Sequence, residues 1–204
     1  AGKDSGSKGT SSKDTLIIAT ANETPSVTTN LHNATAGDYI NQMTHEGLFY
    51  SSADLTPQPA LAESYEIVSD TEWVFKLKQG VKFHNGETLK ASDVVFSYQH
   101  FMDNPKYNSY TDMIEKVEAL DDSHVVITIA RPYSPILHTF FKIKILSEKE
   151  VTSQGSDFGT IANLAGTGPY YMDAETYRPN SGWTLYAFED YWQGAPQIKK
   201  IGYV

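Results

Sequence analysis

The stretch between Ala62 and Tyr98 constrains the fold more than any other part of the chain, because strand and turn signals follow one another closely. The ranges 64–68 and 73–77 alternate apolar and polar residues, which is typical of half-buried strands. Ser69, Asp70 and Thr71 lie between them, and such side chains bond to their own backbone in turns. The sequence therefore predicts an antiparallel strand pair at this point.

A helix is predicted immediately after this pair, over residues 92–101. Gly80 ends the second strand and Asn85-Gly86 is a strong turn signal. Ser92 is a favourable N-cap, and we expect Val95, Phe96 and Phe101 to share the buried side. Trp73 and Phe75 alternate along their strand, so we expect them in the core.

The remaining elements are shorter and are read from the same signals. Further strands are expected at 15–20, 114–120, 125–129, 183–188 and 197–203, with a turn at Asp121-Asp122. Further helices are expected at 38–49, leading into a strand, and at 135–141, with Pro135 in its first turn. Residues 21–31 and the stretch around Pro57 and Pro59 are expected to be connections, and 152–165 is small and polar. This order indicates an α+β (mixed α/β) fold of mostly antiparallel strands with a few helices.

Composition excludes several classes of protein. The chain has 204 residues, with 16 basic and 25 acidic side chains and a net charge of -9, which argues against nucleic-acid binding. It has no cysteine, so disulfides, cysteine zinc sites and a cysteine nucleophile are excluded. No stretch approaches the roughly 18 apolar residues that span a bilayer.

The first fourteen residues contain Gly, Ser, Lys and Asp but no large apolar side chain. Such a segment buries too little surface to offset its ordering entropy, so residues 1–14 are expected to be a flexible tether. No charged-then-apolar signal peptide opens the chain, and Ala1 is expected to be a mature or trimmed end.

Catalytic and metal sites find little support in the sequence. His45-Glu46 begins like a helical zinc motif, but the second histidine is missing. A Ser-His-Asp triad stays open because triads assemble in space, yet no Gly-x-Ser-x-Gly elbow is present. No metal, cofactor or enzymatic activity is expected.

The run Gly166-Thr167-Gly168-Pro169-Tyr170 is not a phosphate loop. The following Gly-Lys-Ser/Thr is missing, and Pro169 removes a backbone N–H that a phosphate needs. We expect a tight chain reversal in which the glycines adopt unusual dihedral angles.

Taken together, these motifs resemble one family. They are the ordered runs AESYE (62–66), WVFKL (73–77), GVKFHNGE (80–87), ASDVVFSY (91–98), VEALDD (117–122), PYSP (132–135), GTGPY (166–170) and YW (191–192), then Pro196 and IKKI (198–201). The chain is similar over about residues 15–204 to the bacterial extracellular solute-binding proteins of family 5, the oligopeptide-, dipeptide- and nickel-binding components of ABC importers.

The resemblance implies one lobe of a class II periplasmic-binding-protein fold, mainly β-sheet with flanking helices and an inserted subdomain. Residues 15–47 and 159–204 would form the main lobe, and 48–158 the inserted subdomain. Relatives are much longer, so the second lobe and the closing part of the first would follow Val204. The chain is then expected to be a fragment that ends near the hinge.

The resemblance also implies a mechanism without chemistry on the ligand. An oligopeptide would bind between two lobes that close on it, through main-chain hydrogen bonds like those of an added strand. The closed form would dock on the membrane permease of an ABC importer. The location would be extracytoplasmic, at the cell surface or in the periplasm, and the protein a monomer. Membrane association would require an N-terminal lipid anchor that this chain does not contain.

Two sets of site residues follow from the resemblance. Glu23 and Thr24, in the loop after the first strand, are candidate ligand-binding residues, with an ordinary surface loop as the alternative. The turn from Gly166 through Thr167, Gly168 and Pro169 to Tyr170 would shape the cleft, and a purely structural turn is equally open.

Other functions stay open within and beyond the family. The same fold could bind a nickel chelate, a sugar or haem, or serve as a surface peptide-sensing or signalling module. A hydrolase has no nominated nucleophile in this sequence.

Overall fold

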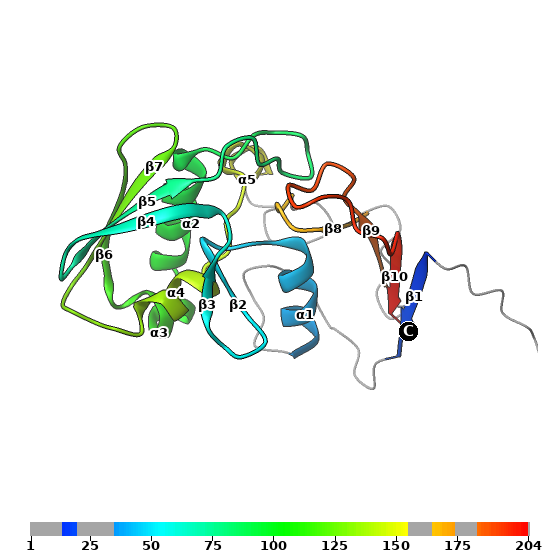
Figure 1. Cartoon of the computed structure of the whole chain (residues 1–204), viewed down its shortest axis with the longest axis horizontal. Coiled ribbons are helices and arrows are strands. Elements are labelled where there is room, and N and C mark those ends of the chain that lie inside the picture. Colours follow the sequence, from blue (N-terminus) through cyan, green and yellow to red (C-terminus); the bar gives the residue numbers. More distant parts are fainter. Residues whose placement is uncertain (1–13, 20–34, 155–164, 174–182, 204) are drawn as a thin grey trace, which may run out of the picture.

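The computed structural model describes residues 14–19, 35–154, 165–173 and 183–203. Over these ranges the chain forms two four-stranded sheets and one two-stranded sheet, accompanied by helices (Figure 1). The mixed fold of mostly antiparallel strands that the sequence predicts is confirmed. Among the described residues, no helix combines the length and apolar character needed to cross a membrane.

The elements have the following bounds. The strands are β1 (Thr15–Ile18), β2 (Phe49–Ser51), β3 (Pro57–Pro59), β4 (Ala62–Ser69), β5 (Glu72–Leu77), β6 (Ile114–Ala119), β7 (His124–Ile129), β8 (Tyr170–Met172), β9 (Trp183–Ala187) and β10 (Lys200–Tyr203). The helices are α1 (Thr35–Thr44), α2 (Ala91–Met102), the 3-10 turn η1 (Pro105–Tyr107), α3 (Asn108–Thr111), α4 (Ile136–Lys142) and α5 (Glu148–Gln154).

The first sheet has the strand order β1-β10-β9-β8 and joins the two ends of the described chain (Figure 1). β1 pairs with β10 in parallel, with Leu16 opposite Ile201, whereas the other pairs are antiparallel. Its core contains Ile40 of α1 together with Leu185, Ile201 and Tyr203. Parallel strands need a long crossover, and here nearly the whole chain lies between them.

The second sheet has the order β4-β5-β7-β6, with α2 packed against it. Trp73 and Phe75 both lie in its core, at 9% and 0% exposure, as their alternation predicts. Val125 and Ile127 oppose these two residues on β7 and are also fully buried. Within the described ranges this core is larger than that of the first sheet, and it extends to the α4 side chain Phe140.

The stretch around Pro57 and Pro59 is a strand, not the expected connection. β3 pairs with β2, so that Phe49 lies opposite Pro59 and Ser51 opposite Pro57. Proline is tolerated because β3 has only one partner strand, and the outer edge of an edge strand requires no backbone donor.

The start and the buried face of α2 differ from the prediction. The N-cap is Lys90, not Ser92, because the Asp93 carboxylate reaches back and accepts the Lys90 backbone N–H at 2.9 Å. Val94 and Phe101 are buried, whereas Val95 and the adjacent Phe96 are only half-buried. Burial of Phe101 is thus confirmed, whereas Val94, Ser97 and Tyr98 form the buried face in place of Val95 and Phe96.

Three smaller differences concern element boundaries. Pro135 is the N-cap residue of α4 and lies before its first turn. Helix α5 extends to Gln154, into a segment that the sequence suggests only to be small and polar. Tyr170 ends the predicted turn but also begins β8.

The division into 15–47, 48–158 and 159–204 stays a prediction about domains. The boundary at 158/159 and the tether residues 1–13 lie outside the described residues. Asp14 is described, and its carbonyl accepts the backbone N–H groups of Lys199 and Lys200 at 2.7 and 3.1 Å.

Candidate functional site

The predicted Gly166–Tyr170 turn packs against the end of α1. A Cβ atom on Gly166 would lie 1.9 Å from the Thr44 carbonyl oxygen, and one on Gly168 would lie 2.5 Å from the Met43 carbonyl oxygen. Neither glycine has a positive φ, so the expectation of unusual dihedral angles is wrong. Glycine is required here because two stretches of backbone approach closely.

His84 holds this turn from the loop before α2. The Gly166 N–H donates to His84 Nδ1 at 3.1 Å, and His84 Nε2 lies 2.9 Å from the Gly168 carbonyl oxygen. Since Nδ1 accepts, the ring proton must be on Nε2, from which it is donated to Gly168. The His84 backbone N–H also donates to the Gly166 carbonyl at 2.9 Å. The neutral imidazole thus forms hydrogen bonds through both ring nitrogens, one with the Gly166 N–H and one with the Gly168 carbonyl.

Glu46 binds the same turn through a side chain. Its Oε2 accepts the Thr167 hydroxyl at 2.9 Å and the Trp192 indole N–H at 2.8 Å, and its Oε1 accepts the Tyr191 hydroxyl at 2.8 Å. Burial raises the pKa of Glu46, and the three donors act in the opposite direction. An acceptor of three hydrogen bonds from distant segments suits a carboxylate.

His45 and His84 both lie beside the Gly166–Tyr170 turn and are both neutral, but they carry their ring protons on different nitrogen atoms. The Thr44 hydroxyl donates to the Ile40 carbonyl at 2.9 Å, so it accepts from His45 Nδ1, 2.8 Å away. His45 Nε2 is then an unprotonated atom, buried and without a hydrogen-bond partner among the described residues. Burial lowers the pKa of His45 to about 3 and that of His84 to about 4.

The last two residues of the turn attach the first sheet. The Pro169 carbonyl accepts the Phe188 N–H at 2.8 Å, and the Tyr170 hydroxyl donates to the Ile198 carbonyl at 3.0 Å. The structure therefore brings Gly166, Thr167, Gly168, Pro169 and Tyr170 together at the junction of the two sheets. Their role in a ligand cleft remains a proposal, and Glu23 and Thr24 lie outside the described residues.

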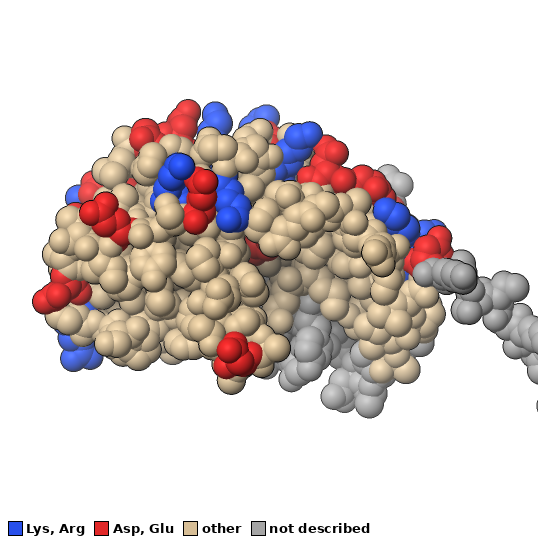
Figure 2. Space-filling model, viewed as in Figure 1, with Lys and Arg blue, Asp and Glu red and all other residues tan. Residues whose placement is uncertain are grey.

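Charged side chains lie at the left and lower edges of the molecule in this view, and they are most numerous along its upper edge (Figure 2). Acidic and basic groups alternate there, and much of the face toward the viewer carries neither charge. Lys82 pairs with Asp190 at 2.7 Å and Lys199 with Glu189 at 2.8 Å, with all four side chains well exposed. Such pairs contribute at most about 1 kcal/mol each.

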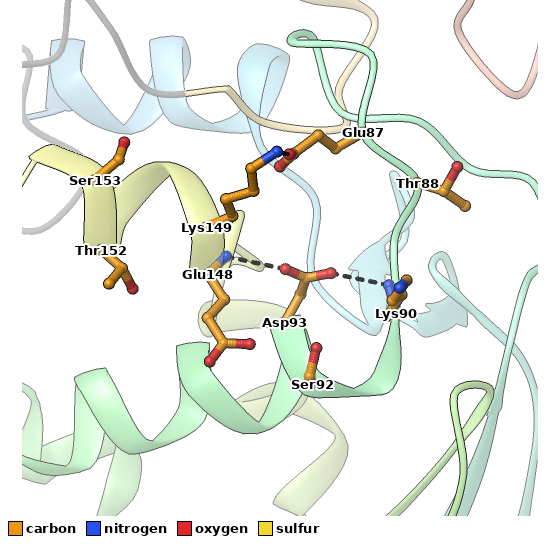
Figure 3. Close-up of a pocket in the computed structure, with 9 residues that line it drawn as sticks. All are labelled: Glu87, Thr88, Lys90, Ser92, Asp93, Glu148, Lys149, Thr152 and Ser153. Carbon is orange, nitrogen blue, oxygen red and sulfur yellow. Dashed lines mark hydrogen bonds and ion pairs between the residues drawn. The ribbon is translucent and has the colours of Figure 1, made fainter.

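A polar surface pocket of about 760 Å³ lies between α2 and α5 (Figure 3). The Asp93 carboxylate accepts the backbone N–H groups of Lys90 and Glu148, both at 2.9 Å. Lys149 pairs with Glu87 at the rim. The two hydrogen bonds of Asp93 join α5 to the start of α2, and the pocket lies beside this contact.

Sequence reasoning singled out the turn but missed Glu46 and His84 as its partners. In the sequence, His45-Glu46 resembles only an incomplete metal motif, and His84 lies inside the run GVKFHNGE that carries the family resemblance. Among the described residues, no three His, Cys, Asp or Glu side chains are close enough together to hold a metal ion. Sequence spacing offered no signal that these residues meet.

Comparison with known proteins supplies the family. The model of "bacterial extracellular solute-binding proteins, family 5 Middle" matches residues 56–204. The di/tripeptide-binding protein 2 of Pseudomonas aeruginosa is 30% identical over 178 residues, covering 74% of this chain and 33% of the relative. The glutathione-binding protein GsiB of Pectobacterium atrosepticum is 31% identical over 186 residues, covering 85% of this chain and 35% of the relative.

Solved structures agree with this match. The chain is similar to MoaA of A. tumefaciens R10, solved with mannopinic acid, with a TM-score of 0.83 and 29% identity over 94% of this chain and 41% of that one. The chain spans about a third of the length of the curated relatives it matches. The matching family consists of solute-binding proteins, which are not enzymes. Because its model covers well over half of the residues, the chain belongs to family 5 of the bacterial extracellular solute-binding proteins.

Proposed function

We propose that the protein captures oligopeptides, including di- and tripeptides, outside the cytoplasm for import by an ABC transporter. Membership of the solute-binding family carries this proposal. The peptide cargo is supported by two relatives whose names specify di/tripeptides and glutathione, which is itself a tripeptide. No chemistry on the ligand is required.

The proposed binding site lies between the lobe described here and a second lobe of the longer protein. The chain covers 33% and 35% of these two relatives, so a full-length protein of their size has ample sequence for a second lobe. Glu23 and Thr24 would contact the ligand from this lobe, and the Gly166–Tyr170 turn would support the cleft. The liganded, closed form would then dock on the permease.

Calorimetry on the full-length protein tests the cargo. We expect di- to hexapeptides to bind with micromolar or tighter affinity, and a ligand at a hundredfold excess over its Kd to stabilise the protein by about 2.7 kcal/mol. A matched peptide with N-methylated amides should bind more weakly, because strand-like recognition uses main-chain hydrogen bonds. Tight binding of a nickel–histidine complex or of mannopinic acid, with no response to peptides, would overturn the peptide cargo.

The two-lobe arrangement is tested with the 204-residue chain alone. Because it would present one wall of the cleft, we expect its affinity for the best peptide to fall by at least about a hundredfold, roughly 2.7 kcal/mol. Affinity of this chain within about tenfold of that of the full-length protein would contradict a site shared between two lobes.

Delivery to a transporter is a separate step with its own test. We expect the full-length protein with peptide to stimulate ATP hydrolysis by the co-encoded permease in proteoliposomes. Recovery of a signalling receptor in its place, with no stimulation of a permease, would favour the surface-sensing alternative.

A further inference from the structure

The joint between the two sheets is built from segments that are far apart in sequence. The end of α1, the loop around His84, the Gly166–Tyr170 turn and the loop after β9 meet there. Glu46 reaches Thr167 across 121 residues of sequence and Trp192 across 146. Local sequence preferences therefore cannot maintain this arrangement, and it depends on the contacts within the joint.

Glu46 and His84 hold alternate residues of the same turn. Thr167 donates its hydroxyl to Glu46, while its neighbours Gly166 and Gly168 bond through their backbones to His84. Three consecutive residues are thus held by two side chains from different parts of the chain. The Gly168 N–H makes a further bond to the Thr44 carbonyl at 3.0 Å.

Glu46 and His84 each match the donors and acceptors of the groups that they contact. An indole N–H can only donate, so Trp192 requires an acceptor at Glu46, and the carboxylate provides one. His84 must accept at Nδ1 and donate at Nε2, which the neutral imidazole does in one tautomer only. A protonated ring would place two donors, Nδ1–H and the Gly166 N–H, against each other.

We propose that Glu46 and His84 are a pair of positioning residues that lock the Gly166–Tyr170 turn and so orient the β1-β10-β9-β8 sheet relative to the β4-β5-β7-β6 sheet. The turn leads directly into β8, and the Pro169 carbonyl binds Phe188, which follows β9. A fixed turn therefore fixes two strands of the first sheet. This role does not depend on which solute the protein carries.

The tautomers of the buried histidines provide a first test, in the unmodified protein. Imidazole nitrogen-15 spectra at pH 7 should show His84 neutral with its proton on Nε2, and His45 neutral with its proton on Nδ1. A charged His84, or one protonated on Nδ1 alone, would overturn the proposal, because the Gly166 N–H would then have no acceptor.

Amide hydrogen exchange in variants tests the locking itself. His84→Ala should accelerate exchange at Gly166, Gly168 and Phe188 by about tenfold or more, with little change at β5 and β7 amides. His84→Gln keeps a donor for the Gly168 carbonyl and should show a smaller effect. His124→Ala, at a histidine outside the joint, is the matched control and should leave the turn unchanged.

Glu46→Gln tests the role of the Glu46 carboxylate. Its control is Glu63→Gln, because Glu63 is an exposed partner of Lys76. We expect a shift of the Trp192 indole proton resonance and faster exchange at the turn in the first variant only. Equal acceleration of all amides, including those of β5 and β7, would show a general loss of stability and contradict a positioning role. If a variant does not fold, the nitrogen-15 spectra of the unmodified protein still test the proposal through the tautomer of His84.

Discussion

At the scale of single residues, two glycines are required for different physical reasons. Gly80 has a φ of +75° and open space around its Cα, so its conformation makes glycine favourable. Gly166 has no positive φ, but any Cβ would collide with the Thr44 carbonyl. From the sequence, Gly80 is expected only to end a strand and Gly166 to adopt an unusual dihedral angle, because residue type does not show which backbone lies opposite.

Alanine substitution should separate these two cases. Gly166→Ala requires the joint to move apart, so we expect the free energy of unfolding to fall by more than about 3 kcal/mol. Gly80→Ala should cost about 1 kcal/mol, the strain of a left-handed conformation. Urea denaturation of both variants measures the difference, and equal losses would contradict the close approach at Gly166.

The buried histidines make stability depend on pH. Burial lowers the pKa of His84 to about 4 and of His45 to about 3, whereas unfolded histidine titrates near 6.5. The unfolded chain therefore binds protons that the folded chain does not, and the free energy of unfolding falls as the pH falls below about 6.5. The expected loss is about 1.4 kcal/mol per pH unit for each histidine between about pH 6 and pH 4.

Urea midpoints measured from pH 7.5 to pH 4.5 check this dependence. Carboxyl groups whose pKa is raised by burial, such as Glu46 and Asp93, act in the opposite direction, so the net slope is smaller. His84→Gln should remove the contribution of one histidine. A slope identical to that of the wild type would show that the pKa of His84 is the same in the folded and unfolded states, and would contradict burial of a neutral ring.

At the scale of elements, helix α2 shows how capping sets a helix boundary. Ser92 is a favourable N-cap by residue type, but Asp93 accepts the Lys90 N–H and the Glu148 N–H and so begins the helix earlier. The second bond also ties α5 to α2, which a local sequence pattern cannot reveal. One carboxylate therefore organises two helices.

Substitutions at these neighbouring positions should have unequal effects. Asp93→Ala leaves two backbone donors without their acceptor, and we expect a loss of about 2 kcal/mol in the free energy of unfolding. Ser92→Ala is the matched control and should change stability by less than about 0.5 kcal/mol. Thermal or urea unfolding of the pair distinguishes them, and the reverse order would restore Ser92 as the cap.

At the scale of the whole molecule, the two sheets have cores of different size. Among the described residues, the β4-β5-β7-β6 sheet packs on a large cluster that includes Phe75, Tyr98 and Phe140, whereas the first sheet has a small cluster around Ile40 and Leu185. The smaller core provides less hydrophobic stabilisation. The joint at Glu46 and His84 is therefore important for keeping the first sheet in place.

Native-state hydrogen exchange should reveal this difference. We expect amides of β9 and β10 to exchange through local opening at a lower free energy than amides of β5 and β7. Leu185→Ala should accelerate exchange in the first sheet more than in the second, because it removes a fully buried side chain from the small core. Uniform protection across both sheets would indicate a single cooperative unit.

Family, fold class and most element positions can be predicted from the order of residues alone. Alternation at 64–68 and 73–77 and the turn between them correspond to β4 and β5, because strand periodicity and turn chemistry are local properties. The same reasoning failed at Pro57 and Pro59, where pairing with β2 outweighs the low strand propensity of proline. It also misjudged which face of α2 is buried.

The contacts of the Gly166–Tyr170 turn, in contrast, are evident only in the folded chain. Sequence inspection identified the turn, but the partners of Thr167 and Gly168 lie 121 and 84 residues away. The parallel pairing of β1 with β10 joins residues that are still farther apart in sequence, such as Thr15 and Lys200. These contacts form because packing of the sheets brings together segments that are remote in sequence. Residue type and spacing along the chain do not show which remote segments will meet.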